Sequence, residues 1–171
     1  RRLAEILEKK GLTVETKEQW AALPSVTGTG KPAVAPIKSK EDLVAEEADG
    51  FNFEILSSSQ FNKAVEASGY KILDKKSRVE STDLQNIWCE CGNIDHEGHD
   101  RGARLARQLD TIFNEIAARI IECLGAGHKS VRVVTDHGWL LLPGGLPKIE
   151  LPHDLSETKW GRCAAIKEGA A

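Results

Sequence analysis

The sequence predicts an α/β protein with a doubly wound, largely parallel β-sheet. Short apolar runs typical of buried strands alternate with segments whose apolar residues recur at helical spacing. Acidic and imidazole side chains directly follow two of the strand-like runs, which is where ligands bind in such sheets. The chain has 171 residues, enough to bury a core as one domain.

Helices are predicted where amphipathic spacing coincides with capping residues. The opening helix is expected to end at Gly11, and Ser57 is expected to begin a helix that ends at Gly69. A charged segment over residues 39–50 is expected to be helical as well. The longest predicted helix covers about residues 101–124, and its apolar face comprises Leu105, Leu109, Ile112, Phe113, Ile116 and Ile120.

Strands are predicted from short apolar or alternating runs. Residues 12–16 alternate, residues 70–73 form a short strand-like run, and Ile87 with Trp88 forms another. A buried strand is predicted at residues 131–134, after the glycines that end the long helix. The alternation of these strands with the helices predicts a parallel sheet.

The most informative stretch follows the strand predicted at residues 131–134. Asp136 and His137 stand side by side at its carboxyl end, and Gly138 allows a tight turn beside them. A carboxylate and an imidazole suit a divalent cation such as zinc or manganese. The competing interpretation is an Asp cap and a surface His in an ordinary turn.

A second group of ligand-type residues follows the strand predicted at Ile87 and Trp88. Asp95 and His99 lie four residues apart, so one turn can present both to one ion. Taken alone, this pair favours a charged helix start, because the helix dipole favours acids there. Two Asp and His pairs, each after a strand-like run, make a metal site the better hypothesis.

The segment over residues 22–34 is rich in Gly, Ser and Thr, and its prolines predict a shaped loop. It does not meet the phosphate-binding P-loop motif, because Ser25 stands where a glycine is needed and Pro32 where a Ser or Thr is needed. A hydroxyl nucleophile is the alternative, since metal coordination can activate a Thr hydroxyl.

Together these segments resemble the alkaline phosphatase superfamily and, within it, the PglZ domain of bacterial BREX phage-defence systems, of type B. The resemblance covers nearly the whole chain and is most specific over residues 22–37, 88–107 and 131–164. The superfamily's Asp-His-Gly motif is met at residues 136–138. Its Asp-x-x-Gly-His motif is met within residues 94–99.

The resemblance implies a metal-dependent phosphohydrolase acting on phosphomonoesters or phosphodiesters. Two divalent ions are implied, with zinc expected and manganese or magnesium as alternatives. Asp95 and His99 would hold one ion, and Asp136 and His137 would hold the other together with the nucleophile.

The nucleophile implied by the resemblance is Thr27, with Thr29 as the fallback in the same loop. The phosphate ester would phosphorylate Thr27, and the phosphate would then be released by hydrolysis. Lys31 would contact the phosphate as a point charge, although a loop lysine is more often simply solvated.

The resemblance also implies ligands that residues 1–171 do not supply. The superfamily takes a further Asp from its first strand and a further His from a strand near the domain's C-terminus. His153 is not expected to replace that His, because it lies in a polar loop flanked by proline. We therefore expect a partial domain, with a sheet incomplete at both ends. The full-length protein would be active, and residues 1–171 alone inactive.

Partners implied by the resemblance are a phosphate ester, with nucleic acid as one option, and other BREX proteins in the cytoplasm. The net charge of −3 is too small to argue for or against nucleic acid. No apolar run is long enough to cross a membrane. A second function class stays open: a non-catalytic interaction module of a defence complex, with a vestigial metal site.

The four cysteines leave one rival metal site open. Their irregular spacing predicts reduced thiols rather than a disulfide framework. Cys89, Cys91, His96 and His99 could form a small structural zinc site, although the Cys-x-Cys spacing is tight for zinc. That site would leave the Asp and His pair after the later strand unexplained.

Overall fold

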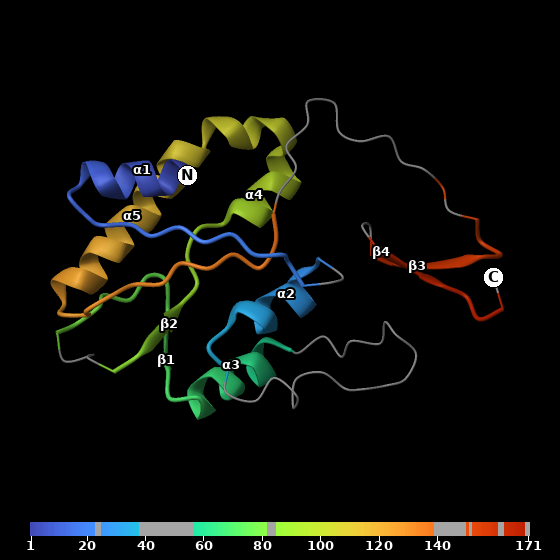
Figure 1. The fold of residues 1–171 in the computed structure, drawn as a ribbon, viewed down its shortest axis with the longest axis horizontal. Helices are drawn as coiled ribbons and strands as arrows, with labels where there is room; N and C mark the ends of the chain where they lie inside the picture. The colour runs from blue at the N-terminus through green and yellow to red at the C-terminus, as the bar shows by residue number, and fades with distance from the viewer. Residues whose placement is uncertain are drawn as a thin grey trace.

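A small parallel sheet flanked by helices forms the main body of the described chain (Figure 1). An antiparallel hairpin of β3 (Ser156–Trp160) and β4 (Cys163–Ile166) lies apart from it. The chain is therefore mixed α/β, as predicted. The computed structural model describes residues 1–22, 25–37, 57–81, 85–138, 150, 152–160 and 163–169.

The parallel sheet pairs β1 (Lys71–Leu73) with β2 (Ile87–Cys89), which confirms two predicted strands. Ile72 lies opposite Trp88, and both pack on the apolar cluster of α3 (Ser58–Ala67). Alternate residues point to the other face, where Leu73 and Cys89 join a cluster with Cys123 of α5 (Leu109–Gly125). Helices thus cover both faces, as buried parallel strands require.

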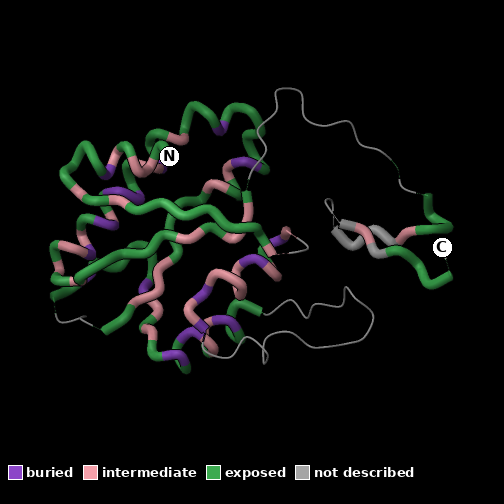
Figure 2. Tube along the Cα trace, viewed as in Figure 1, coloured by how far each residue is buried: buried purple, intermediate pink, exposed green. Residues whose placement is uncertain are grey.

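The largest apolar cluster joins α1 (Arg2–Lys9) to α5. Figure 2 shows buried positions on both helices and on α3. Fully burying a Leu or Ile side chain contributes roughly 1.5–3 kcal/mol, so this face of α5 is a main source of stability. Its predicted role as core is confirmed, and the buried members of the cluster are Leu7, Leu105, Ile112, Ile116, Ala117 and Ile120.

The ends of two helices follow the capping residues that predicted them. α1 ends just before Gly11, whose φ is 83°. Ser57 and Gln60 form a capping box, in which each side chain accepts a hydrogen bond from the other residue's backbone amide. α3 ends before Gly69, which has a φ of 89°.

The long helix predicted over 101–124 is interrupted, so that prediction is wrong in part. The chain forms α4 (Ile94–Arg101), a 3₁₀ turn (Gly102–Arg107) and then α5. Gly102 causes the break, because its φ of 52° and ψ of −129° cannot continue a helix. Leu105 stays buried within the 3₁₀ turn, and therefore the apolar pattern runs through the interruption.

Two predicted strands are extended but unpaired within the described residues. Residues 12–16 and 131–134 join no β-ladder there. Val131 and Val133 are 37% and 49% exposed, so the prediction of a buried strand at this place is wrong. An apolar run becomes a buried strand only where neighbouring strands and helices cover it. The helix predicted over residues 39–50 lies outside the described residues.

Candidate metal and phosphate site

The two predicted ligand pairs reach one place from different segments. β2 leads through residues 90–93 into α4, which carries Asp95 and His99 on successive turns. The extended segment over residues 130–135 ends at Asp136 and His137. The first pair therefore follows a strand, as the sequence predicted, whereas the second follows a segment that forms no strand with the described residues.

Contacts between the pairs are direct. Asp95 Oδ1 lies 3.7 Å from His99 Nε2 and 3.8 Å from His137 Nε2. His137 Nε2 also lies 3.7 Å from Asp136 Oδ2. The structure thus brings all four predicted ligand residues into one continuous group.

The ring of His137 is held in one orientation. Its side chain is only 4% exposed, and its Nδ1 lies 3.0 Å from the carbonyl oxygen of Gly138. A carbonyl can only accept, so we assign the hydrogen to Nδ1, and the neutral ring then has its lone pair on Nε2. That lone pair faces the carboxylates of Asp95 and Asp136, an arrangement that either a cation between them or a proton on Nε2 would make favourable.

The carboxylate of Asp136 is also oriented locally. Its Oδ1 accepts a hydrogen bond from the backbone amide of His137 at 3.1 Å. Its other oxygen is the one that faces the His137 ring. In metal sites, the carboxylate or imidazole atom that does not bind the metal is typically held by a hydrogen bond.

The chemistry of the four donors fits a divalent ion better than their present spacing does. Ligands of a tetrahedral zinc at about 2.0–2.1 Å from the metal lie roughly 3.3 Å apart. The donor atoms here stand a few tenths of an ångström wider. Within the described residues, no group of three or more His, Cys, Asp or Glu side chains is arranged as a ready metal cluster. Binding would need these side chains to close in.

The segment predicted as a loop over residues 22–34 is helical from Thr27 onward. α2 (Thr27–Val34) begins after Val26, which provides no side-chain cap. Thr29 and Gly30 donate their backbone amides to the Val26 carbonyl. The amides of Thr27 and Gly28 have no partner among the described residues, as is usual for the first amides of a helix.

Thr27 and Thr29 differ in ways that bear on the choice of nucleophile. The Thr27 side chain is exposed at the start of α2. Thr29 is partly buried, and its hydroxyl donates to the Val26 carbonyl at 3.1 Å. Gly30, one turn after Thr27, touches the backbone of Asp136, so the first turn of α2 borders the ligand group.

Lys31, predicted to contact phosphate, is engaged elsewhere in this structure. Its Nζ lies 2.5 Å from Glu90 Oε1 and 4.4 Å from the centroid of the Phe61 ring. The ion pair links α2 to the residue that follows β2. A role in phosphate binding stays a prediction, and it requires Lys31 to leave Glu90.

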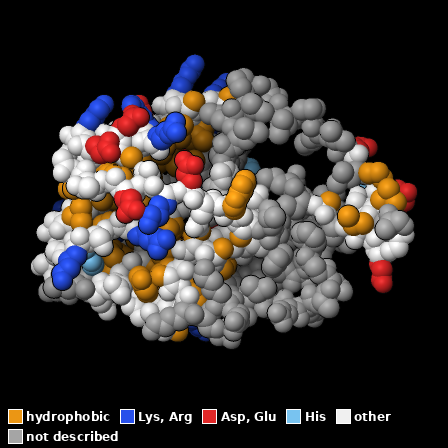
Figure 3. Space-filling model, in the orientation of Figure 1, with side chains coloured by type: hydrophobic (Ala, Val, Ile, Leu, Met, Phe, Trp, Pro, Cys, Tyr) orange, Lys and Arg blue, Asp and Glu red, His pale blue; other side chains and the backbone are white. Residues whose placement is uncertain are grey.

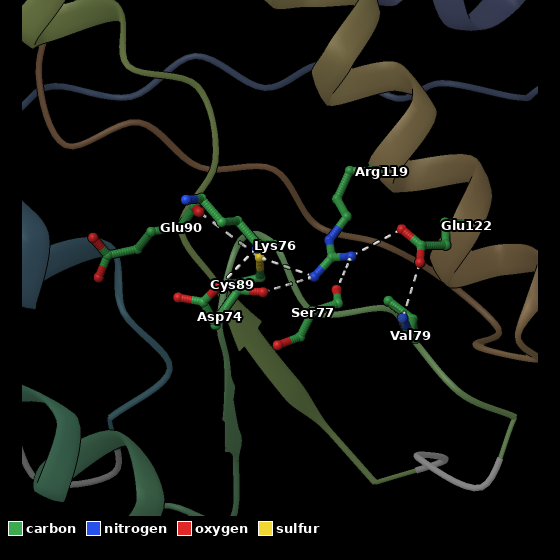
Figure 4. A network of polar contacts seen from close by, with 8 residues as sticks. All are labelled: Asp74, Lys76, Ser77, Val79, Cys89, Glu90, Arg119 and Glu122. Atoms are coloured by element: carbon green, nitrogen blue, oxygen red, sulfur yellow. Dashed lines mark hydrogen bonds and ion pairs between the residues drawn. The ribbon is translucent and has the colours of Figure 1, made fainter.

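A network of hydrogen bonds around Arg119 holds the end of β2 (Figure 4). The sequence did not predict this network. Arg119 donates to the carbonyls of Ser77 and Asp74 and to Glu122, at 2.6–3.1 Å. Its Nη2 also lies 3.7 Å from Cys89 Sγ. The available signal was a basic residue placed within the apolar face of α5.

The rival zinc site of two cysteines and two histidines is not gathered in the structure. Cys89 faces Arg119, and Cys91 is exposed. His96 Nε2 lies 3.4 Å from Asp100 Oδ2 instead of near a thiol. Cys89, Cys91 and Cys123 are free thiols, as predicted.

The surface and the comparisons add little to the site itself. Figure 3 shows basic and acidic side chains interspersed over the described part of the face in view, which favours no single class of charged partner. No helix among the described residues is both long and apolar enough to cross a membrane.

Comparison with protein-family models, curated proteins and solved structures found no match.

Proposed function

We propose that this chain carries catalytic residues of a metal-dependent phosphohydrolase acting on phosphomonoesters or phosphodiesters. The observation that carries the proposal is the approach of Asp95 to His137 at 3.8 Å. The two residues come from separate segments, and each was predicted as a ligand from its type and position. The proposal implies a doubly wound sheet of alkaline-phosphatase type in the complete protein.

Four side chains would hold two divalent ions, with zinc expected and manganese or magnesium as alternatives. Asp95 with His99 would serve one ion, and Asp136 with His137 the other. Such ions polarise a phosphate ester and neutralise its charge. The Gly138 carbonyl orients the His137 ring, and the His137 amide orients the Asp136 carboxylate.

Thr27 would act as the nucleophile toward phosphorus. Its oxygen would lose its proton and form the new bond to phosphorus while the ester bond breaks, and the departing alkoxide would take up one proton to leave as the alcohol, so that the step balances. Water would then hydrolyse the phosphorylated Thr27 and regenerate the hydroxyl. The amides of Thr27 and Gly28, which have no partner among the described residues, support a phosphate at this point, because a helix N-terminus favours anions.

A second candidate function is a non-catalytic interaction module of a defence complex with a vestigial metal site. The observation that favours it is the wide spacing of the donor atoms, together with the exposure of Asp95 (47%) and His99 (67%). Other BREX proteins as partners and a cytoplasmic location belong to both candidates, and they rest on the resemblance alone.

Hydrolysis of chromogenic phosphate monoesters and diesters by the full-length protein, with added zinc or manganese, tests the proposal. His137→Ala is expected to lower turnover more than about 100-fold, beyond the usual cost of removing a group that only orients a ligand. His96→Ala is the matched control, because His96 lies on α4 and pairs with Asp100. Absence of metal-dependent turnover in the wild type would favour the interaction module.

A further inference from the structure

We infer that Gly30 is a positioning residue that sets the distance between the nucleophile on α2 and the ligands at Asp136 and His137. The inference rests on the proposed function. A Cβ atom at Gly30 would lie 2.4 Å from the carbonyl oxygen of Asp136, 3.0 Å from its carbonyl carbon and 3.1 Å from its Cβ. Gly30 is buried, and two backbones meet there.

The contact cannot be relieved by turning a side chain. The nearest atoms at Asp136 are backbone atoms, and ordinary contact with a Cβ begins at 3.4 Å. A methyl group at Gly30 would therefore have to move the two segments apart by about 1 Å, the difference between 3.4 and 2.4 Å. A misplacement of about 1 Å at a catalytic site can cost roughly 100-fold in rate.

Gly30 and Thr27 are linked by the geometry of the helix. Residues three apart share a helix face, so the face of α2 that carries Thr27 is the one that meets Asp136. Asp136 in turn is tied to His137 through the hydrogen bond from the His137 amide. A change at Gly30 therefore shifts nucleophile and ligands relative to each other, although Gly30 itself bears no reactive group.

Gly30→Ala in the full-length protein tests the inference, with Gly125→Ala as the matched control. Gly125 is also helical, and an added Cβ there would meet no atom within 4 Å. For Gly30→Ala we expect the zinc dissociation constant to rise at least tenfold and kcat to fall about 100-fold, with a smaller change in KM. Gly125→Ala should match the wild type in all three.

A readout independent of activity is amide hydrogen exchange of the metal-free protein, measured well below the unfolding temperature. Faster exchange should be confined to residues 26–34 and 130–138 in Gly30→Ala. Wild-type exchange and wild-type zinc affinity in this variant would overturn the inference. Loss of cooperative unfolding would overturn it as well, since Gly30 would then serve folding in general.

The same measurements separate the inference from the proposed function. If the wild type binds no zinc and hydrolyses no ester, the proposed function fails, and localised exchange in Gly30→Ala would still support the contact. If the wild type is active and Gly30→Ala equals it, only the inference fails.

Discussion

At the scale of single residues, the four proposed ligands differ most in burial. The His137 side chain is 4% exposed and held by the Gly138 carbonyl, whereas the side chains of Asp95 and His99 are 47% and 67% exposed. A buried, hydrogen-bonded ligand keeps its geometry, while an exposed one can rotate toward an ion. The site therefore has one fixed half and one adaptable half.

Thr27→Ala is expected to abolish turnover in the full-length protein while leaving zinc content nearly unchanged. The change removes the proposed nucleophile, an exposed hydroxyl, and leaves all four proposed ligands in place. Thr29→Ala is the control, because its hydroxyl bonds the Val26 carbonyl and its loss should cost only about 1 kcal/mol of stability. Kinetics and metal analysis of both variants check this. Turnover surviving in Thr27→Ala would move the nucleophile to Thr29 or to water.

The ligand residues could be predicted from the sequence because each Asp and His pair has a local signature. A strand-like run followed by both residue types needs no knowledge of distant contacts. Gly30, Glu90 and Arg119 could not be found in this way. Their importance comes from contacts with Asp136, Lys31 and Cys89, which only the folded chain brings close.

At the scale of elements, α2 shows where local preference was overruled. Two glycines and Pro32 lie within it, and each glycine disfavours a helix by about 1 kcal/mol relative to alanine. The segment that follows α2 is anchored by Ala35 and Ile37, which are buried against α3. Tertiary packing therefore supports a helix where the sequence predicted a loop.

Acid is expected to weaken the link between α5 and the segment that follows β1. The Val79 amide and the Arg119 guanidinium both donate to Glu122 and hold the pKa of that carboxyl below its usual value of 4.5. A lowered folded-state pKa means that this stabilisation is present above pH 4.5 and is lost as the pH falls through the folded-state value. The free energy of unfolding should therefore drop in that range.

Urea unfolding at a series of pH values checks the prediction. Glu122→Gln keeps an acceptor for Val79 but loses the charge, so its stability should approach that of the wild type below pH 4.5. Glu115→Gln removes a charge from an exposed position on the same helix and should leave the pH profile unchanged. A constant difference between wild type and Glu122→Gln would contradict the argument.

At the scale of the whole molecule, helices on both faces of a parallel sheet were predictable, but the extent of the sheet was not. Alternating strand and helix patterns indicate the layers. Which strands pair depends on contacts far apart in sequence, and only β1 and β2 form a parallel ladder in the described chain. Residues 12–16 and 131–134 have strand-like sequences but pair with none of the described residues.

Residues 1–171 are expected to bind zinc weakly, with dissociation constants above the micromolar range. Each proposed ion would have two strong ligands, Asp95 with His99 or Asp136 with His137, whereas catalytic zinc usually has three from the protein. Calorimetric titration checks this. Tight binding at two sites that survives His153→Ala and replacement of the cysteines by serine would show that the ligand count is wrong.

Residues 1–171 are also expected to self-associate through the extended segment at residues 130–135. Val131 and Val133 are 37% and 49% exposed, and the backbone of this segment joins no ladder with the described residues. Such an edge pairs readily with another chain, and a lysine on it opposes pairing. Sedimentation velocity should show association that rises with concentration and falls markedly in Val133→Lys.

Ile121→Lys places the same charge on α5 at an apolar residue that is 39% exposed, so it should associate like the wild type. A monomer at all concentrations, or an equal effect of both lysines, would show that this edge does not drive association.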